Sequence, residues 1–325
     1  MITRLVALGI TATLLFGPAS EANAEAWPSK ATPIRLVIPF PPGGTTDMLG
    51  RMVAQGLSKE LGVPVVAENL PGANGNLGLL AVRRAKADGN TIMLGTPGPM
   101  IVNKYIYDTI AFDAKDAPAP IALVAELPNV LMTRRDLPVK SVAELVKLGK
   151  ADKGKLTFGS PGVGASGHVS NELFMLKANF SATHVPYKGS SPMLTDLMGG
   201  NIDFAVDQIS SALQFIKSGR LKALAVTSKT RSSQLPDVPT LQEAGIRDYE
   251  VSVWFCLAAP ANTPAERVRV LNAATNKVLS DPAVREQIAV IGARPLGGSP
   301  QDLARRIADE EKNIVEVTRV VNFKN

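Results

Sequence analysis

Cysteine and histidine, the residues that most often bring metal or nucleophilic chemistry to a site, are scarce in this sequence. Its 325 residues include one cysteine, Cys256, and two histidines, His168 and His184. A single cysteine cannot form an internal disulfide, so the fold must depend on its hydrophobic core. The three residues lie far apart in the sequence and match no ligand spacing of a zinc site. We therefore expect no metal or other cofactor, and a buried, structural Cys256.

Aromatic residues and clustered charge are also sparse. Aromatic residues make up 5% of the chain, and the formal net charge is +6 at pH 7. The lysines and arginines are scattered, and no basic stripe alternates with aromatic residues as in nucleic-acid-binding surfaces. The sequence thus predicts no nucleic-acid partner, although a modest positive field attracts small anions.

Long apolar runs are missing after the first 24 residues. Residues 5–19 are apolar, follow a single Arg4, and precede the small-residue sequence Ala22-Asn23-Ala24. This pattern is typical of a cleaved signal peptide, here residues 1–24, and the apolar run is too short for a membrane anchor. It contains no cysteine for lipid attachment. We therefore expect a soluble exported protein in a periplasm.

The rest of the sequence alternates between strand-like and helical patterns, which predicts an α/β fold with largely parallel sheets and, at this length, two domains. Strands are expected at 34–40, 63–69, 91–96, 121–133 (interrupted at Pro128), 156–160, 182–186, 202–206, 221–228 and 251–259. Helices are expected at 47–61, 77–87, 141–150, 168–178, 191–199, 211–218, 264–280, 282–291 and 300–320.

Glycine-rich loops stand where strands give way to helices, at 42–47, 69–78 and 159–168, and a fourth follows a strand at 95–99. A helix N-terminus offers unpaired N–H groups and a partial positive charge, and glycine lets a ligand approach them closely. Each loop alone could be a tight turn capped by Thr or Ser. Four together favour an anion site. The loops at 42–47 and 161–168 also resemble each other, one in each half of the chain, as in a two-sided clamp.

Catalytic interpretations of these loops are less well supported. Residues 162–167 match G-x-G-x-x-G but lack the acidic residue about 20 positions later that a dinucleotide site requires. Ser166 lies outside a G-x-S-x-G motif, and His168, two residues later, does not face it. We expect no catalytic residue, and an exported hydrolase using Ser166 or Ser160 is the less favoured alternative.

Ordered motifs across nearly the whole chain resemble the Bug (TctC-type) family, the extracytoplasmic solute receptors of tripartite tricarboxylate transporters. They are Trp27-Pro28, PFPPGG at 39–44 with Asp47 and Arg51, PGA at 71–73, Ser160 to His168 with Gly162 and Gly164, VPYKG at 185–189, GRLKALA at 219–225, LPDVPT at 235–240 and EAG at 243–245.

The resemblance implies a two-lobed periplasmic binding protein (Venus-flytrap) with a ligand cleft between lobes and two chain crossovers, near 124–131 and 250–258. Domain 1 would comprise residues 25–126 plus 254–325, and domain 2 residues 127–253. The expected ligand is a small carboxylate held by the loops at 42–47 and 162–168. Di- and tricarboxylates, amino acids and aromatic acids all remain open.

The expected function is capture of this solute by lobe closure, by a monomer that delivers it to membrane permease subunits. A sensor that hands its closed form to a kinase uses the same clamp and remains an alternative. Asp207 either reads a second end of the ligand or caps the following helix. The candidate ligand-binding residues are Phe40, Pro42, Gly43, Gly44, Thr45, Thr46, Asp47, Asn69, Gly95, Thr96, Pro97, Ser160, Gly162, Gly164, Ala165, Ser166, His168, Tyr187 and Asp207.

Overall fold

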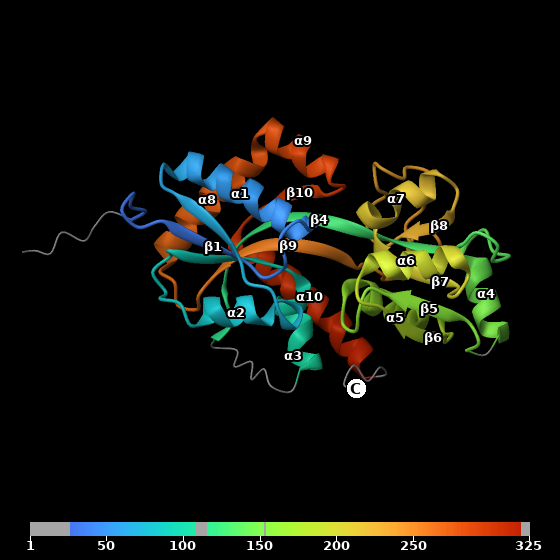
Figure 1. Cartoon of the computed structure of the whole chain (residues 1–325). Coiled ribbons are helices and arrows are strands. Elements are labelled where there is room, and N and C mark those ends of the chain that lie inside the picture. Colours follow the sequence, from blue (N-terminus) through green and yellow to red (C-terminus); the bar gives the residue numbers. More distant parts are fainter. Residues whose placement is uncertain (1–26, 108–115, 153, 320–325) are drawn as a thin grey trace, which may run out of the picture.

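The computed structural model describes residues 27–107, 116–152 and 154–319, and its elements form two lobes (Figure 1). The expected signal peptide, residues 1–24, lies outside the described residues. Within the described part of the chain, no helix has both the length and the apolar character to cross a membrane.

The first lobe is built on a mixed sheet. Strands β2 (Val65–Asn69), β1 (Ile34–Ile38) and β3 (Thr91–Gly95) are parallel, and β9 (Ser252–Ala259) joins β3 antiparallel. The first part of β4 (Ala119–Arg134) pairs with β9 and with β10 (Arg294–Gly297). The helices of this lobe are α1 (Thr45–Leu61), α2 (Asn76–Arg83), α8 (Ala265–Ser280) and α9 (Pro282–Val290).

Helix α1 illustrates how the sequence produces these elements. Leu49, Val53 and Leu57, each four residues apart, are all fully buried and form its inner face. Gly62 ends the helix in the left-handed conformation, with φ of 69°. The buried face packs among the strands' apolar residues in one of the cores of the first lobe.

The second lobe has a smaller sheet of β4, β7 (Phe204–Gln208), β5 (Thr157–Ser160) and β6 (Thr183–Pro186), with β8 (Leu221–Val226) also paired to β4. Its helices are α4 (Val142–Asp152), α5 (Ser166–Ala178), α6 (Ser190–Gly199) and α7 (Ile209–Lys217). Strands β5, β6 and β7 are parallel, so their carboxyl ends and the loops that follow lie at one edge of the sheet.

The two lobes share the long strand β4. Up to Pro128 it pairs with β9 of the first lobe, and from Asn129 it pairs with β7 and β8 of the second. Proline cannot donate to a ladder, so it is tolerated where a strand changes partners. The return crossing lies beside it: Ser252 of β9 pairs with Pro128, whereas the N–H of Val251 donates to the carbonyl of Thr227, 3.0 Å away, in the second lobe.

The C-terminal helix α10 (Pro300–Thr318) contacts both lobes (Figure 1). A capping box between Ser299 and Asp302 begins it. Glu316 forms an ion pair with Lys177 of α5 at 3.8 Å, and Glu311 pairs with Lys104 of the short helix α3 (Asn103–Ile106).

The predicted α/β two-lobed fold is confirmed, but its sheets are mixed rather than largely parallel, because β4 pairs antiparallel with β7, β8, β9 and β10. Three further differences are local. The strand expected at 121–133 continues through Pro128, because the proline falls at the change of partner. Strand β10 was not predicted, since its four residues Arg294–Gly297 contain a proline and end at a glycine. Residues 98–106, for which the sequence predicted no helix, form a π-helical turn, η2 (Gly98–Val102), followed by α3, so the predicted loop 95–99 is partly helical.

Candidate ligand-binding site

A cavity of about 250 Å³ lies between the lobes, a suitable size for a small solute. Its wall includes residues at the beginnings of α1 and η2 from the first lobe, and of α5, α6 and α7 from the second. Val251 and Val253, where the chain enters β9, also line the cavity, as do Glu310 and Ile314 of helix α10.

Four of these helices begin without a side-chain cap. The cap residues of α1, α5 and α6 are Gly44, Ala165 and Gly189, which have no capping oxygen, and Gln208 makes no capping bond at α7. Their first-turn N–H groups therefore depend on water or a ligand for an acceptor. Uncapped helix N-termini that meet at one cavity form an anion site without a basic side chain.

The loop before α1 is fixed by Asp47. One carboxylate oxygen accepts the N–H of Gly43 at 2.9 Å, and the other accepts Asn69 Nδ2 at 2.9 Å and pairs with Arg51 Nε at 2.9 Å. Burial opposes the charge, but the Gly43 N–H, Arg51 and Asn69 outweigh it and lower the pKa of Asp47. Asp47 thus holds the loop in shape and does not itself line the cavity.

The loop before α5 is fixed in the same way by His168. Its Nδ1 accepts the N–H of Gly164 at 3.1 Å. His168 is the third residue of α5, as Asp47 is of α1, and Gly43 and Gly164 both lie two residues before their helix with φ of 85° and 74°. Only glycine adopts this conformation without cost. The resemblance between the two loops therefore extends to their hydrogen bonds.

The two histidines, which are 16 positions apart in the sequence, are in contact. Their rings stack with centroids 3.9 Å apart, because β5 and β6 pair in parallel and bring His184 beside Phe158. Parallel pairing of strands thus joins segments that lie apart in the sequence. Burial and the neighbouring His168 lower the pKa of His184 to about 4.

The same arrangement places Ser160 Oγ 2.7 Å from His184 Nε2, a pair that the sequence did not predict. Ser160 is fully buried and does not line the cavity. This serine–histidine contact therefore belongs to the core beneath the loop.

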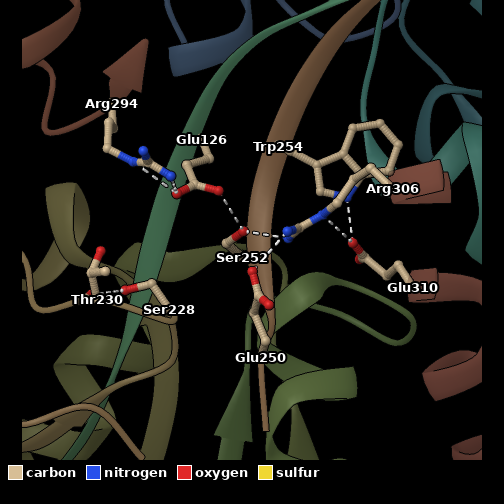
Figure 2. A network of polar contacts seen from close by, with 9 residues as sticks. All are labelled: Glu126, Ser228, Thr230, Glu250, Ser252, Trp254, Arg294, Arg306 and Glu310. Atoms are coloured by element: carbon tan, nitrogen blue, oxygen red, sulfur yellow. Dashed lines mark hydrogen bonds and ion pairs between the residues drawn. The ribbon is translucent and has the colours of Figure 1, made fainter. Parts of the chain in front are cut away.

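On the α10 side of the cavity, a polar network supports the buried Glu310 (Figure 2). Trp254 Nε1 donates to Glu310, and Arg306 Nε lies 3.5 Å from the same carboxylate. Arg306 also donates to Glu250 and to Ser252 Oγ, both at 2.8 Å. Burial raises the pKa of Glu310 to about 7, against the opposing effect of Arg306 and Trp254.

The network continues through the strands that join the lobes (Figure 2). Ser252 Oγ on β9 donates to Glu126 on β4 at 3.4 Å, and Glu126 accepts Arg294 of β10 at 2.6 Å. It therefore ties β4, β9, β10 and α10 together at the point where the chain crosses between lobes.

Asp207 lies in β7, where the strand approaches α7, and lines the cavity with 2% of its surface exposed. In the part of the chain that the structure describes, its Oδ2 atom has no hydrogen-bond partner. Burial raises its pKa to about 6, and the Ser190 hydroxyl and Gln208 N–H act in the opposite direction. Of the two roles considered for Asp207, this placement favours contact with a ligand.

The structure brings only part of the predicted residue set to the cavity. Those that line it are Phe40, Thr46, Thr96, Pro97, Gly164, Ala165, Ser166 and Asp207. Those that lie outside its wall are Pro42, Gly43, Gly44, Thr45, Asp47, Asn69, Gly95, Ser160, Gly162, His168 and Tyr187. Tyr187 donates its hydroxyl to Asp196 at 2.7 Å.

Sequence reasoning missed the rest of the wall: Asn74, Gly98, Val102, Pro161, Val169, Gly189, Ser190, Gln208, Val251, Val253, Glu310 and Ile314. Five of these could have been found in the sequence: Gly189 and Ser190 precede a predicted helix, and Asn74, Gly98 and Pro161 belong to the predicted loops 69–78, 95–99 and 159–168. Asn74 adopts φ of 51° and donates to Asn103 at 2.8 Å. Nothing in the sequence indicated that Glu310 lines the cavity, because a charged residue on an amphipathic helix is usually solvent-exposed.

Comparison with known proteins agrees with this geometry. A family model described as "Tripartite tricarboxylate transporter family receptor" (TctC) matches residues 49–322. Protein BugT of Bordetella pertussis is 34% identical, over 99% of this chain and 98% of its own.

Two solved structures are similar throughout. Rpa4515 of R. palustris with adipate is 38% identical with a TM-score of 0.77, and the match covers 90% of this chain and 98% of that one. MatC of Rhodopseudomonas palustris with bound malate is 30% identical with a TM-score of 0.73, covering 88% and 98%.

Proposed function

Because this chain belongs to the TctC family of tripartite tricarboxylate transporter receptors, we propose that its interlobe cavity binds a small carboxylate through the uncapped helix N-termini. Members of this family are periplasmic solute-binding receptors, and this chain is one of them. The adipate and malate in the two similar structures support a carboxylate ligand for this chain as well.

The observation that carries the proposal is the convergence of uncapped helices from both lobes. Thr46 is the second residue of α1, and Ala165 and Ser166 begin α5. A carboxylate between them would accept N–H and hydroxyl hydrogen bonds, directly or through water. Hydrogen bonds to a charged group contribute about 1.5–3 kcal/mol each. Four bonds at the upper end of this range supply about 12 kcal/mol, and an ordering cost of about 4 kcal/mol then leaves about −8 kcal/mol, a micromolar Kd.

Lobe closure follows from the same arrangement. The donors at Thr46 and Ser166 belong to different lobes, so a ligand that binds both stabilises the closed form. The proposed domains are residues 25–126 plus 254–325 and residues 127–253, and the observed change of partners at Pro128–Asn129 lies close to the first boundary. The closed form would deliver its solute to permease subunits. A sensor kinase as recipient remains the second possibility.

Export and the absence of turnover belong to the proposal too. Residues 1–24 would act as a cleaved signal peptide. The cavity would bind its solute unchanged, because the Ser160–His184 pair lies away from its wall.

Thermal unfolding of the mature protein tests the proposal. The protein would be unfolded and refolded to remove bound solute, then melted with small carboxylates and with their amides. A carboxylate at about 100 times its Kd should add about 2.7 kcal/mol of stability, and its amide should add little. Equal stabilisation by acid and amide, or none by any carboxylate, would contradict the carboxylate site.

A further inference from the structure

We propose that the solute carries an ammonium group besides its carboxylate, and that Asp207 binds this group. The inference rests on the proposed function, because it concerns the second contact of the same ligand. It names an amino acid, with the amine at any position, as the solute class.

The first argument is the state of the Asp207 carboxylate. Asp207 is 2% exposed and lines the cavity, and its Oδ2 atom has no hydrogen-bond partner among the described residues. A buried carboxylate oxygen with no donor is costly, and proteins rarely leave one so. A donor that arrives with the ligand would remove this cost. Ser190 and Gln208, also in the wall, favour the charged carboxylate, but burial outweighs them.

The second argument is the charge of the wall. Among the described residues that line the cavity, the ionisable ones are Asp207 and Glu310, and none is lysine, arginine or histidine. Glu310 already accepts Trp254 Nε1 and faces Arg306. Asp207 is therefore the acid with an oxygen available to a ligand. Its negative charge would repel a second carboxylate and attract an ammonium.

The third argument is that an ammonium group fits Asp207 better than a neutral donor does. A hydroxyl or amide could also donate to Oδ2, but it would leave a buried negative charge uncompensated. An ammonium supplies both the proton and the charge, as in other charge-assisted hydrogen bonds. The helix N-termini meanwhile remain available for the ligand's carboxylate, so the two charges of an amino acid each meet an opposite one.

Matched ligand sets test the idea on the refolded mature protein. Each set contains succinate, glutarate or adipate together with the α-amino and ω-amino monocarboxylates of the same carbon number. Isothermal titration calorimetry gives the Kd of each compound. We expect the tightest compound of the panel to be an amino acid, with a Kd at least roughly tenfold below that of the diacid of equal length.

Two variants test whether Asp207 causes the preference for amino acids over diacids. Asp207→Asn keeps the shape of the side chain and removes its charge, so the preference for amino acids should vanish and the diacids should bind more tightly. Asp248→Asn removes the same charge at an exposed position outside the cavity and should change nothing. Thermal melting of the free variants verifies that each one folds, and the wild-type ranking is informative without any variant.

Failure of the ammonium proposal can be distinguished from failure of the proposed function. Diacids that bind the wild type as tightly as the amino acids, or a preference that survives in Asp207→Asn, would overturn the ammonium proposal and leave the carboxylate receptor intact. If neither these compounds nor the carboxylates of the thermal panel bind, the proposed function fails, and this inference fails with it.

Discussion

At the scale of single residues, the residues recognised in the sequence divide into those that contact the cavity and those that shape it. Asp47 and His168 stood out because each follows a glycine loop, yet both hold that loop by accepting a glycine N–H. Sequence position indicates that a residue lies near a site. It does not tell which way its side chain points, because that depends on partners such as Asn69 that are distant in the chain.

Asp207 leads to a stability prediction. An acid whose pKa rises on folding, here to about 6, binds its proton more tightly in the folded state, so the folded protein loses stability as the pH rises from about 4 to 6. The loss persists above pH 6. Ligand-free Asp207→Asn should therefore be more stable than the wild type at pH 7, by up to about 3 kcal/mol, with the gain disappearing near pH 4. Urea unfolding at several pH values measures this difference, and a gain that is equal at pH 4 and pH 7 would contradict it.

At the scale of elements, the G-x-G-x-x-G match at 162–167 does not indicate a dinucleotide site, but its third glycine has a packing role. The 162–167 match to G-x-G-x-x-G has its third glycine, Gly167, near the beginning of α5. A Cβ atom there would lie 2.2 Å from the carbonyl oxygen of Val206 in β7. The glycine thus permits close packing of helix on strand, which is one of its roles in dinucleotide folds as well, although no dinucleotide is implied.

Gly167→Ala should therefore displace the beginning of α5 from β7. We expect a loss of about 1–3 kcal/mol in stability from overpacking, together with weaker ligand binding, because α5 forms part of the cavity wall. Gly199→Ala on α6 is the matched control, since its Cβ would meet nothing closer than 3.7 Å. Calorimetric titration and urea unfolding of both variants provide the comparison. Equal behaviour of the two would show that the close approach is unimportant.

The network around Arg306 gives a second prediction for an element, helix α10. Arg306→Met leaves Glu250 and Glu310 without their cation, which should cost about 3 kcal/mol of stability. Arg305→Met, one residue earlier, removes an exposed arginine paired with Asp302 and should cost less than about 0.5 kcal/mol. Urea unfolding of both variants decides. Similar losses would mean that the network contributes little to the joining of the lobes.

At the scale of the whole molecule, family and two-lobed architecture were predictable, because ordered motifs and alternating patterns extend over most of the chain. The part played by α10 was not. Its Glu310 reaches the cavity through contacts with Trp254 and Arg306, and these depend on how α10 packs across both lobes. Local periodicity identifies a helix but says nothing about which neighbours it meets.

The central claim is that uncapped helix N-termini of both lobes bind the solute's carboxylate. A crystal structure of the mature protein with the best carboxylate of the thermal panel tests it most directly. The account predicts carboxylate oxygens within hydrogen-bond distance, directly or through one water, of N–H or hydroxyl groups at the beginnings of α1 and α5. A ligand carboxylate bound instead by a lysine or arginine, or by one lobe alone, would contradict it.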